Sequence, residues 1–174
     1  LSADVRYGPQ QLAGELVLSD LPMSLVREFA DLDLEGNAAA RLKLTGTPAA
    51  PSAVLALRLR DMALAGQDVG QLPPGDLALD ATLGNGRLEA TLNAERITQE
   101  PIRLRVELPV EFALVPARFA VAEGAPIGGA IQARADLGRL SRLIELDDQT
   151  LEGLLVVDLK LAGTLTTPQM TGQA

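Results

Sequence analysis

The chain has 174 residues, of which 47% are hydrophobic, 22% charged and only 2% aromatic, and this composition is typical of one globular domain. It contains no cysteine and no histidine, which excludes thiol nucleophiles, Ser-His triads, zinc-finger sites and imidazole bases. The 23 acidic and 15 basic residues give a net charge of −8, which disfavours binding to nucleic acids or anionic membranes.

No targeting segment is recognisable in the sequence. No run of about 18 apolar residues occurs, and the first residues, LSADVRYGPQ, lack the basic start and apolar core of a signal peptide. Since the sequence does not begin with Met, we expect an excised piece of a longer protein.

The first predicted element is a short helix in SDLPMSLVREFAD. Asp20 is a candidate N-cap, Pro22 lies in the first turn, and Leu21, Leu25 and Phe29 form one apolar stripe. A helix of two to three turns is too short to be stable alone in water. We therefore expect it to lie on a sheet.

Period-two alternation begins at residue 32 and predicts two long amphipathic strands. Over residues 32–46 the even positions are apolar or small and the odd positions are mostly polar. The segment PSAVLALRLRDMAL alternates in the same way but changes phase at Asp61, which predicts a β-bulge.

Further strands follow a Pro-Pro-Gly break at residues 73–75. DLALDATLGNGRLEATLNAE predicts a hairpin that turns at residues 84–86, and PIRLRVELPVEFAL predicts a strand with an edge or bend at Pro109. Shorter strands are expected around Phe119 and Ile131. A second short helix is predicted in DLGRLSRLIELDD, with Leu140, Leu143 and Ile144 on one stripe.

A segment of the chain is repeated. EGNAAARLKLTGTPAAP (35–51) and EGLLVVDLKLAGTLTTP (152–168) share eight of seventeen residues at an offset of 117. The two predicted helices precede them in register, so the repeat covers about 12–52 and 127–169. Its Gly and Pro residues are typical of turns. We expect one β-rich domain over residues 1–174, built from a large sheet unit that continues in the natural protein.

These patterns resemble the C-terminal region of TamB-like proteins, within the AsmA-like group of bacterial envelope proteins. The resemblance lies in LKLTGTPAAPSAVLALRL, LPPGDLALDATLGNGRLEATL, LPVEFALVPARF and LEGLLVVDLKLAGTLTTPQMTG, which cover most of the chain. It implies a mostly β fold: a long, bent antiparallel or mixed sheet with a taco-like open groove, and two short helices.

The resemblance also implies a function. Such proteins are anchored in the inner membrane of Gram-negative-type bacteria, span the periplasm towards an outer-membrane partner of the Omp85 family (TamA-like), and are linked to phospholipid transport and outer-membrane protein assembly. No catalysis, cofactor or metal is expected.

A uniform apolar groove suits the transport of lipid tails. Exposing a tail of about sixteen carbons to water costs on the order of 12 kcal/mol, and a chemically uniform lining offers no sticking point. The predicted lining residues are Leu42, Leu44, Leu55, Leu57, Leu59, Leu77, Leu79, Leu88, Leu92, Ile102, Leu104, Val106, Leu108, Leu155, Val157, Leu159 and Leu161.

Three alternatives remain open. An alternating leucine face is ordinarily the inner face of a closed β-sandwich. An exposed sheet edge would instead pair with strands of client outer-membrane proteins, giving an assembly platform without lipid conduction. The third is an enzyme, for instance one that uses paired carboxylates, and its candidate residues are Asp31, Asp33, Asp147 and Asp148.

Overall fold

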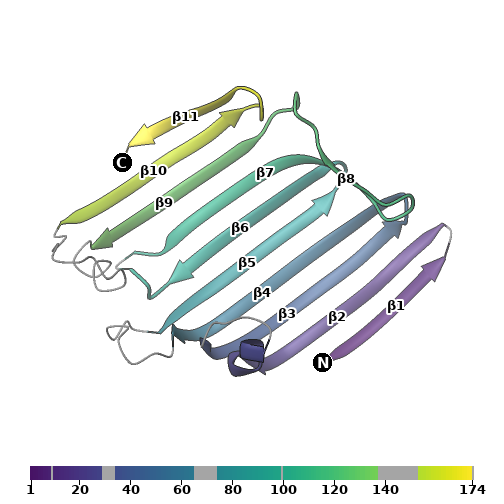
Figure 1. Cartoon of the computed structure of the whole chain (residues 1–174), viewed down its shortest axis with the longest axis horizontal. Coiled ribbons are helices and arrows are strands. Elements are labelled where there is room, and N and C mark those ends of the chain that lie inside the picture. The colour runs from purple at the N-terminus through teal and green to yellow at the C-terminus, as the bar shows by residue number, and fades with distance from the viewer. Residues whose placement is uncertain (9, 29–33, 65–73, 99, 137–152, 174) are drawn as a thin grey trace.

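The alternating segments form one open sheet in the computed structural model, which describes residues 1–8, 10–28, 34–64, 74–98, 100–136 and 153–173 (Figure 1). Eleven strands pair in the order β1-β2-β3-β4-β5-β6-β7-β9-β10-β11, and β8 pairs with β7. Every pairing is antiparallel. The strands are β1 (Ser2–Gly8), β2 (Gln11–Pro22), β3 (Leu34–Thr47), β4 (Ala50–Leu64), β5 (Gly75–Gly84), β6 (Arg87–Glu95), β7 (Ile102–Ala113), β8 (Arg118–Val121), β9 (Gly128–Asp136), β10 (Leu154–Gly163) and β11 (Pro168–Gln173).

The predicted mostly β fold with a large antiparallel sheet is confirmed, but the first of the two predicted short helices is wrong. The described residues contain no α-helix. Residues 19–22 belong to β2, and Met23–Glu28 form a 3-10 helix, η1. In the second predicted helix, Asp136 ends β9 and residues 137–148 lie outside the described residues.

Strand pairing explains why the first helix does not form. Asp20, the predicted N-cap, has φ 47° and lies at a bulge between Leu18 and Leu21, after which Leu21 pairs with Ala38. The neighbouring strand β3 satisfies the backbone groups of this segment. A lone helix of two turns would lack comparable support.

Two predicted irregularities are confirmed. The register of β4 against β5 shifts between Leu59 and Met62, which is the predicted β-bulge, and Asp61 within it has a positive φ of 52°. In the β5–β6 hairpin Asn85 and Gly86 both have positive φ, of 52° and 72°, which is the type I′ turn that suits a two-residue hairpin.

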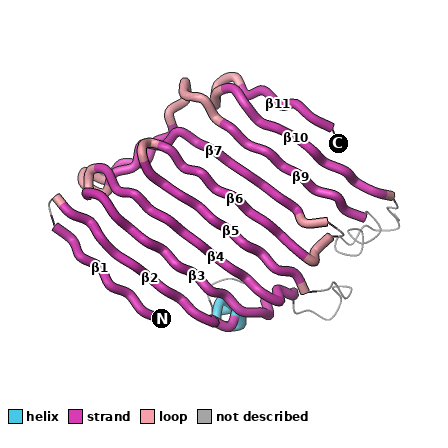
Figure 2. Tube along the Cα trace, turned by 180° about the vertical axis from the view of Figure 1, so that it is seen from behind, coloured by secondary structure: helices cyan, strands magenta, loops and turns pink. Residues whose placement is uncertain are grey.

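The sheet is a single layer with a very small core (Figure 2). Among the described residues, no second sheet covers it. The described buried hydrophobic residues are few and scattered along the sheet: Leu12, Met23, Ala38, Ala94, Val110, Ile127 and Ala135. A closed sandwich is therefore absent from the described part of the chain.

The offset of 117 residues recurs in the backbone. β9, β10 and β11 follow β7 in the sheet as β2, β3 and β4 follow β1. Gly36 and Gly153 have φ of 118° and 133°, and Gly46 and Gly163 have φ of 100° and 93°. Each member of the second pair faces a proline across a hairpin, which gives both hairpins the same geometry.

Candidate functional site: the apolar face of the sheet

Cross-strand register brings the predicted lining residues onto one face. Residues directly opposite each other in an antiparallel pair point to the same side of the sheet. One row of paired residues crosses nine strands in the order Leu16, Leu42, Leu55, Ala81, Ala90, Val106, Gly129, Leu161 and Met170.

Neighbouring rows, two residues away along each strand, place the other predicted residues on this same face. One runs Leu18, Ala40, Leu57, Leu79, Leu92, Leu104, Ile131 and Leu159, and the next includes Leu59, Leu77, Ala94 and Ile102. A further row on the same face flanks the first row on its other side and contains Leu44, Ala53, Leu83, Leu88 and Leu108. Leu155 and Val157 on β10 lie on this face as well, since they pair with Ala135 and Ala133 on β9. We call this surface the apolar face.

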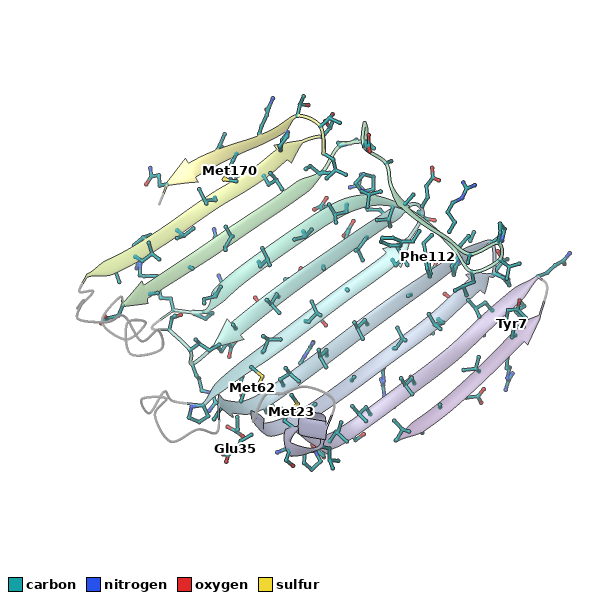
Figure 3. All side chains as sticks on the ribbon, in the orientation of Figure 1. Tyr7, Met23, Glu35, Met62, Phe112 and Met170 are labelled. Atoms are coloured by element: carbon teal, nitrogen blue, oxygen red, sulfur yellow. The ribbon has the colours of Figure 1, made fainter. Side chains whose placement is uncertain are left out.

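The apolar face is uncovered over the described residues. Sixteen of the seventeen predicted residues are half-buried by their neighbours, Leu155 is exposed, and none is buried. Exposure rises at the two edges, to 65% for Tyr7 and 68% for Met170, which lie on opposite edge strands (Figure 3). The face is thus a broad hydrocarbon surface in contact with solvent.

Sequence reasoning missed part of this face. Leu16, Leu18, Leu83 and Ile131 belong to it but were not predicted as lining. Their signal was present, because residues 16–18 and 81–83 continue the period-two pattern. What the sequence lacked was the register of β2 and β9, which decides their side of the sheet.

The opposite face carries the charges. Arg41 forms an ion pair with Glu15 at 3.4 Å, and Arg58 forms one with Asp80 at 2.8 Å. Glu107 forms ion pairs with both Arg87, at 3.2 Å, and Arg105, at 2.9 Å. Lys43 and Lys160 point to the same side. Exposed ion pairs of this kind stabilise little, but they keep this face hydrated.

Each end of the strands carries an added element. At one end, η1 packs against β3, with Met23 buried. At the other end, β7 leaves β9 after Glu107 and pairs with β8, and Phe112 meets Phe119 edge-to-face with ring centroids 6.4 Å apart. Figure 3 shows Met23 and Phe112 at these two opposite ends.

An ion-pair cluster near the η1 end joins β4 and β5 to Arg96, the residue that follows β6. Arg96 Nε donates to Asp76 Oδ2 at 2.8 Å, Arg96 Nη2 donates to Asp61 Oδ1 at 2.9 Å and also to Asp76 Oδ1, and the Asp61 amide donates to Asp76 Oδ1 at 3.0 Å. The Arg96 hydrogen bond, followed by that of the Asp61 amide, lowers the pKa of Asp76 below 3.8. The cluster therefore fixes the bulge at Asp61.

We expect Asp76→Asn to destabilise the sheet at neutral pH but not in strong acid. Because the pKa of Asp76 is lowered by folding, its stabilisation is present above the unfolded pKa and is lost as the pH falls through the folded value. The measurement is the urea midpoint of both proteins from pH 7 to pH 2. A difference between them that does not shrink below pH 3.8 would contradict this role.

The described residues contain no group of three or more acidic side chains that could hold a metal, and no helix long and apolar enough to cross a membrane. The carboxylates of the predicted enzyme alternative, at residues 31, 33, 147 and 148, lie outside the described residues.

Comparison with known proteins adds no relative. No family model, curated protein or solved structure matches the chain.

Proposed function

We propose that the apolar face binds phospholipid acyl chains and conducts them across the strands, between β1 and β11. The observation that carries the proposal is the continuity of this face, with paired apolar or small residues in nine consecutive strands of the sheet order. The surface acts by binding and not by catalysis.

The dimensions of the sheet support conduction. Ten strands in one layer span about 43 Å at the usual strand spacing, whereas one leaflet of a bilayer core is about 15 Å thick. A lipid tail on this face can therefore move across several strands without losing contact with hydrocarbon side chains. The aqueous barrier for such a tail is on the order of 12 kcal/mol, and the face replaces water with leucine and alanine side chains along the path.

The route supports an amphiphile in particular. The described ion pairs lie on the opposite face or at the strand ends, so a tail on the apolar face meets no fixed charge, while its polar head stays in solvent. We include in the proposal that the sheet bends around the tails as a taco-like open groove. The half-buried state of the inner leucines is consistent with such crowding.

The resemblance to TamB-like proteins supplies the setting of the proposal. On that basis the chain is a periplasmic segment of an inner-membrane-anchored protein that works with an Omp85-family, TamA-like partner and supports outer-membrane protein assembly. A second candidate is an assembly platform without lipid conduction. It is favoured by one observation: no strand of the described residues pairs with the outer edges of β1 and β11, which offer backbone groups to a client strand (Figure 1).

We expect the purified chain to carry phospholipid. Lipid extraction and mass spectrometry of protein prepared without detergent should identify diacyl phospholipids, and delipidated protein should immobilise a phospholipid spin-labelled near the end of its tail. Protein that carries no lipid and leaves the spin label freely mobile would refute conduction and leave the platform.

A further inference from the structure

A pocket lies at the hairpin end of the sheet, beneath β7 and β8. Its volume is about 480 Å³, within the range of roughly 300–1,000 Å³ that is usual for small-molecule sites. It is open to solvent on one side and bordered by the β3–β4 turn, the β5–β6 turn and the β7–β8 hairpin. Its apolar lining includes Pro51, Leu83, Val110, Phe112 and Val115.

Hydrogen bonds hold the walls of this pocket in place. The amides of Leu114 and Val115 both donate to the carbonyl of Pro48, at 2.7 and 3.2 Å, and the amide of Val110 donates to the carbonyl of Gly86 at 2.9 Å. The Val110 side chain is only 2% exposed. The hairpin is therefore tied to both neighbouring turns, and the pocket is preformed.

One ion pair, of Arg118 with Glu111, lines the pocket. The Arg118 side chain is 65% exposed and touches the Glu111 carboxylate at 3.3 Å. A guanidinium has five N–H donors in a planar fork, so the contact with Glu111 leaves N–H groups of Arg118 for a further acceptor. In a chain of net charge −8, an arginine beside an apolar pocket is complementary to a ligand with a hydrocarbon body and an anionic head.

We propose that this hairpin pocket binds a single-chain anionic amphiphile, with its hydrocarbon against Leu83, Val110 and Phe112 and its carboxylate or phosphate against Arg118. The site lies at the strand ends, apart from Leu104 in the middle of the apolar face. The proposal does not depend on conduction across the strands.

The test is equilibrium dialysis of the whole chain against palmitate, hexadecyl phosphate and hexadecanol. Arg118→Gln is expected to weaken binding of one or both anions about tenfold and to leave hexadecanol unchanged. Ala50→Trp, at an exposed position in the lining, is expected to fill the pocket and weaken all three ligands at least tenfold. The matched control is Arg134→Gln, which removes an arginine that pairs with Glu100 away from the pocket.

The outcomes separate this site from the proposed function. If Arg118→Gln weakens the binding of palmitate alone, the site prefers a fatty acid. If it weakens palmitate and hexadecyl phosphate alike, the site recognises any anionic head. Either result supports the site. Leu104→Arg should keep palmitate binding, and Ala50→Trp should keep phospholipid tails on the apolar face. Anion binding by Arg118→Gln equal to wild type, or palmitate binding by Ala50→Trp equal to wild type, would overturn the pocket while leaving conduction standing.

Discussion

Replacing Leu104 with arginine is expected to lower the transfer of phospholipid between donor and acceptor vesicles at least about tenfold. Leu104 lies in the middle of the apolar face, paired with Leu92 on one side and Ile131 on the other. A guanidinium there would either be desolvated by each passing tail or bring water into the path. Desolvating an unpaired charge costs several kcal/mol, far more than a factor of ten in rate requires.

Gln132→Arg is the matched control for Leu104→Arg. Gln132 follows Ile131 on β9 but points to the opposite face, where it is exposed and paired with Asp158. The control adds the same charge next to Ile131, the cross-strand partner of Leu104, but on the opposite face, so transfer should remain at the wild-type rate. Both variants must show wild-type β-sheet content by circular dichroism. If folded Leu104→Arg transferred lipid at the wild-type rate, the conduction proposal would be wrong. The edge-pairing platform would then be favoured, since the substitution lies far from the edge strand β11 and leaves its pairing edge intact.

Replacing Gly46 with valine is expected to destabilise the sheet by about 3 kcal/mol, with a fall in melting temperature of about 6–12 °C. Gly46 has φ 100°, a conformation that side chains other than glycine rarely adopt. A Cβ there would lie 2.6 Å from the carbonyl oxygen of Ala50 in the paired strand. The hairpin between β3 and β4 would have to open to relieve this contact.

Gly163→Val should behave like Gly46→Val, because the repeat gives it the same geometry. Its φ is 93°, and a Cβ would clash with the carbonyl oxygen of Thr167. Gly124→Val is the control, since a Cβ at Gly124 meets nothing within 4 Å. Thermal melting followed by circular dichroism measures all three. Equal melting temperatures for Gly46→Val and Gly124→Val would show that the repeated glycine is dispensable.

The strands and the sidedness of the sheet were readable from the sequence. Side chains alternate across a strand with period two, so Leu55, Leu57 and Leu59 had to share a face whatever their partners were. The turn at Asn85 and Gly86 was readable for a similar reason, because positive φ at two successive positions strongly favours these residues. Both are local properties of the chain.

Other features depend on partners far away in the sequence. The segment at Asp20 has helical spacing, yet pairing with β3 converts it to strand, since the neighbouring backbone offers hydrogen bonds that a short helix cannot replace. The cluster of Arg96 with Asp61 and Asp76 joins groups up to 35 residues apart, and no local pattern announces it.

By itself the sequence determined that this protein builds amphipathic strands with one hydrocarbon face, and that a strand–turn–strand unit recurs after 117 residues. Only the tertiary structure decided that these faces join into one surface, that no second layer covers it in the described residues, and that the β7–β8 hairpin forms one wall of an open pocket at its end. The reason is register. A shift of one residue between two strands would turn one hydrocarbon face to the opposite side of the sheet, and long-range pairing alone fixes that choice.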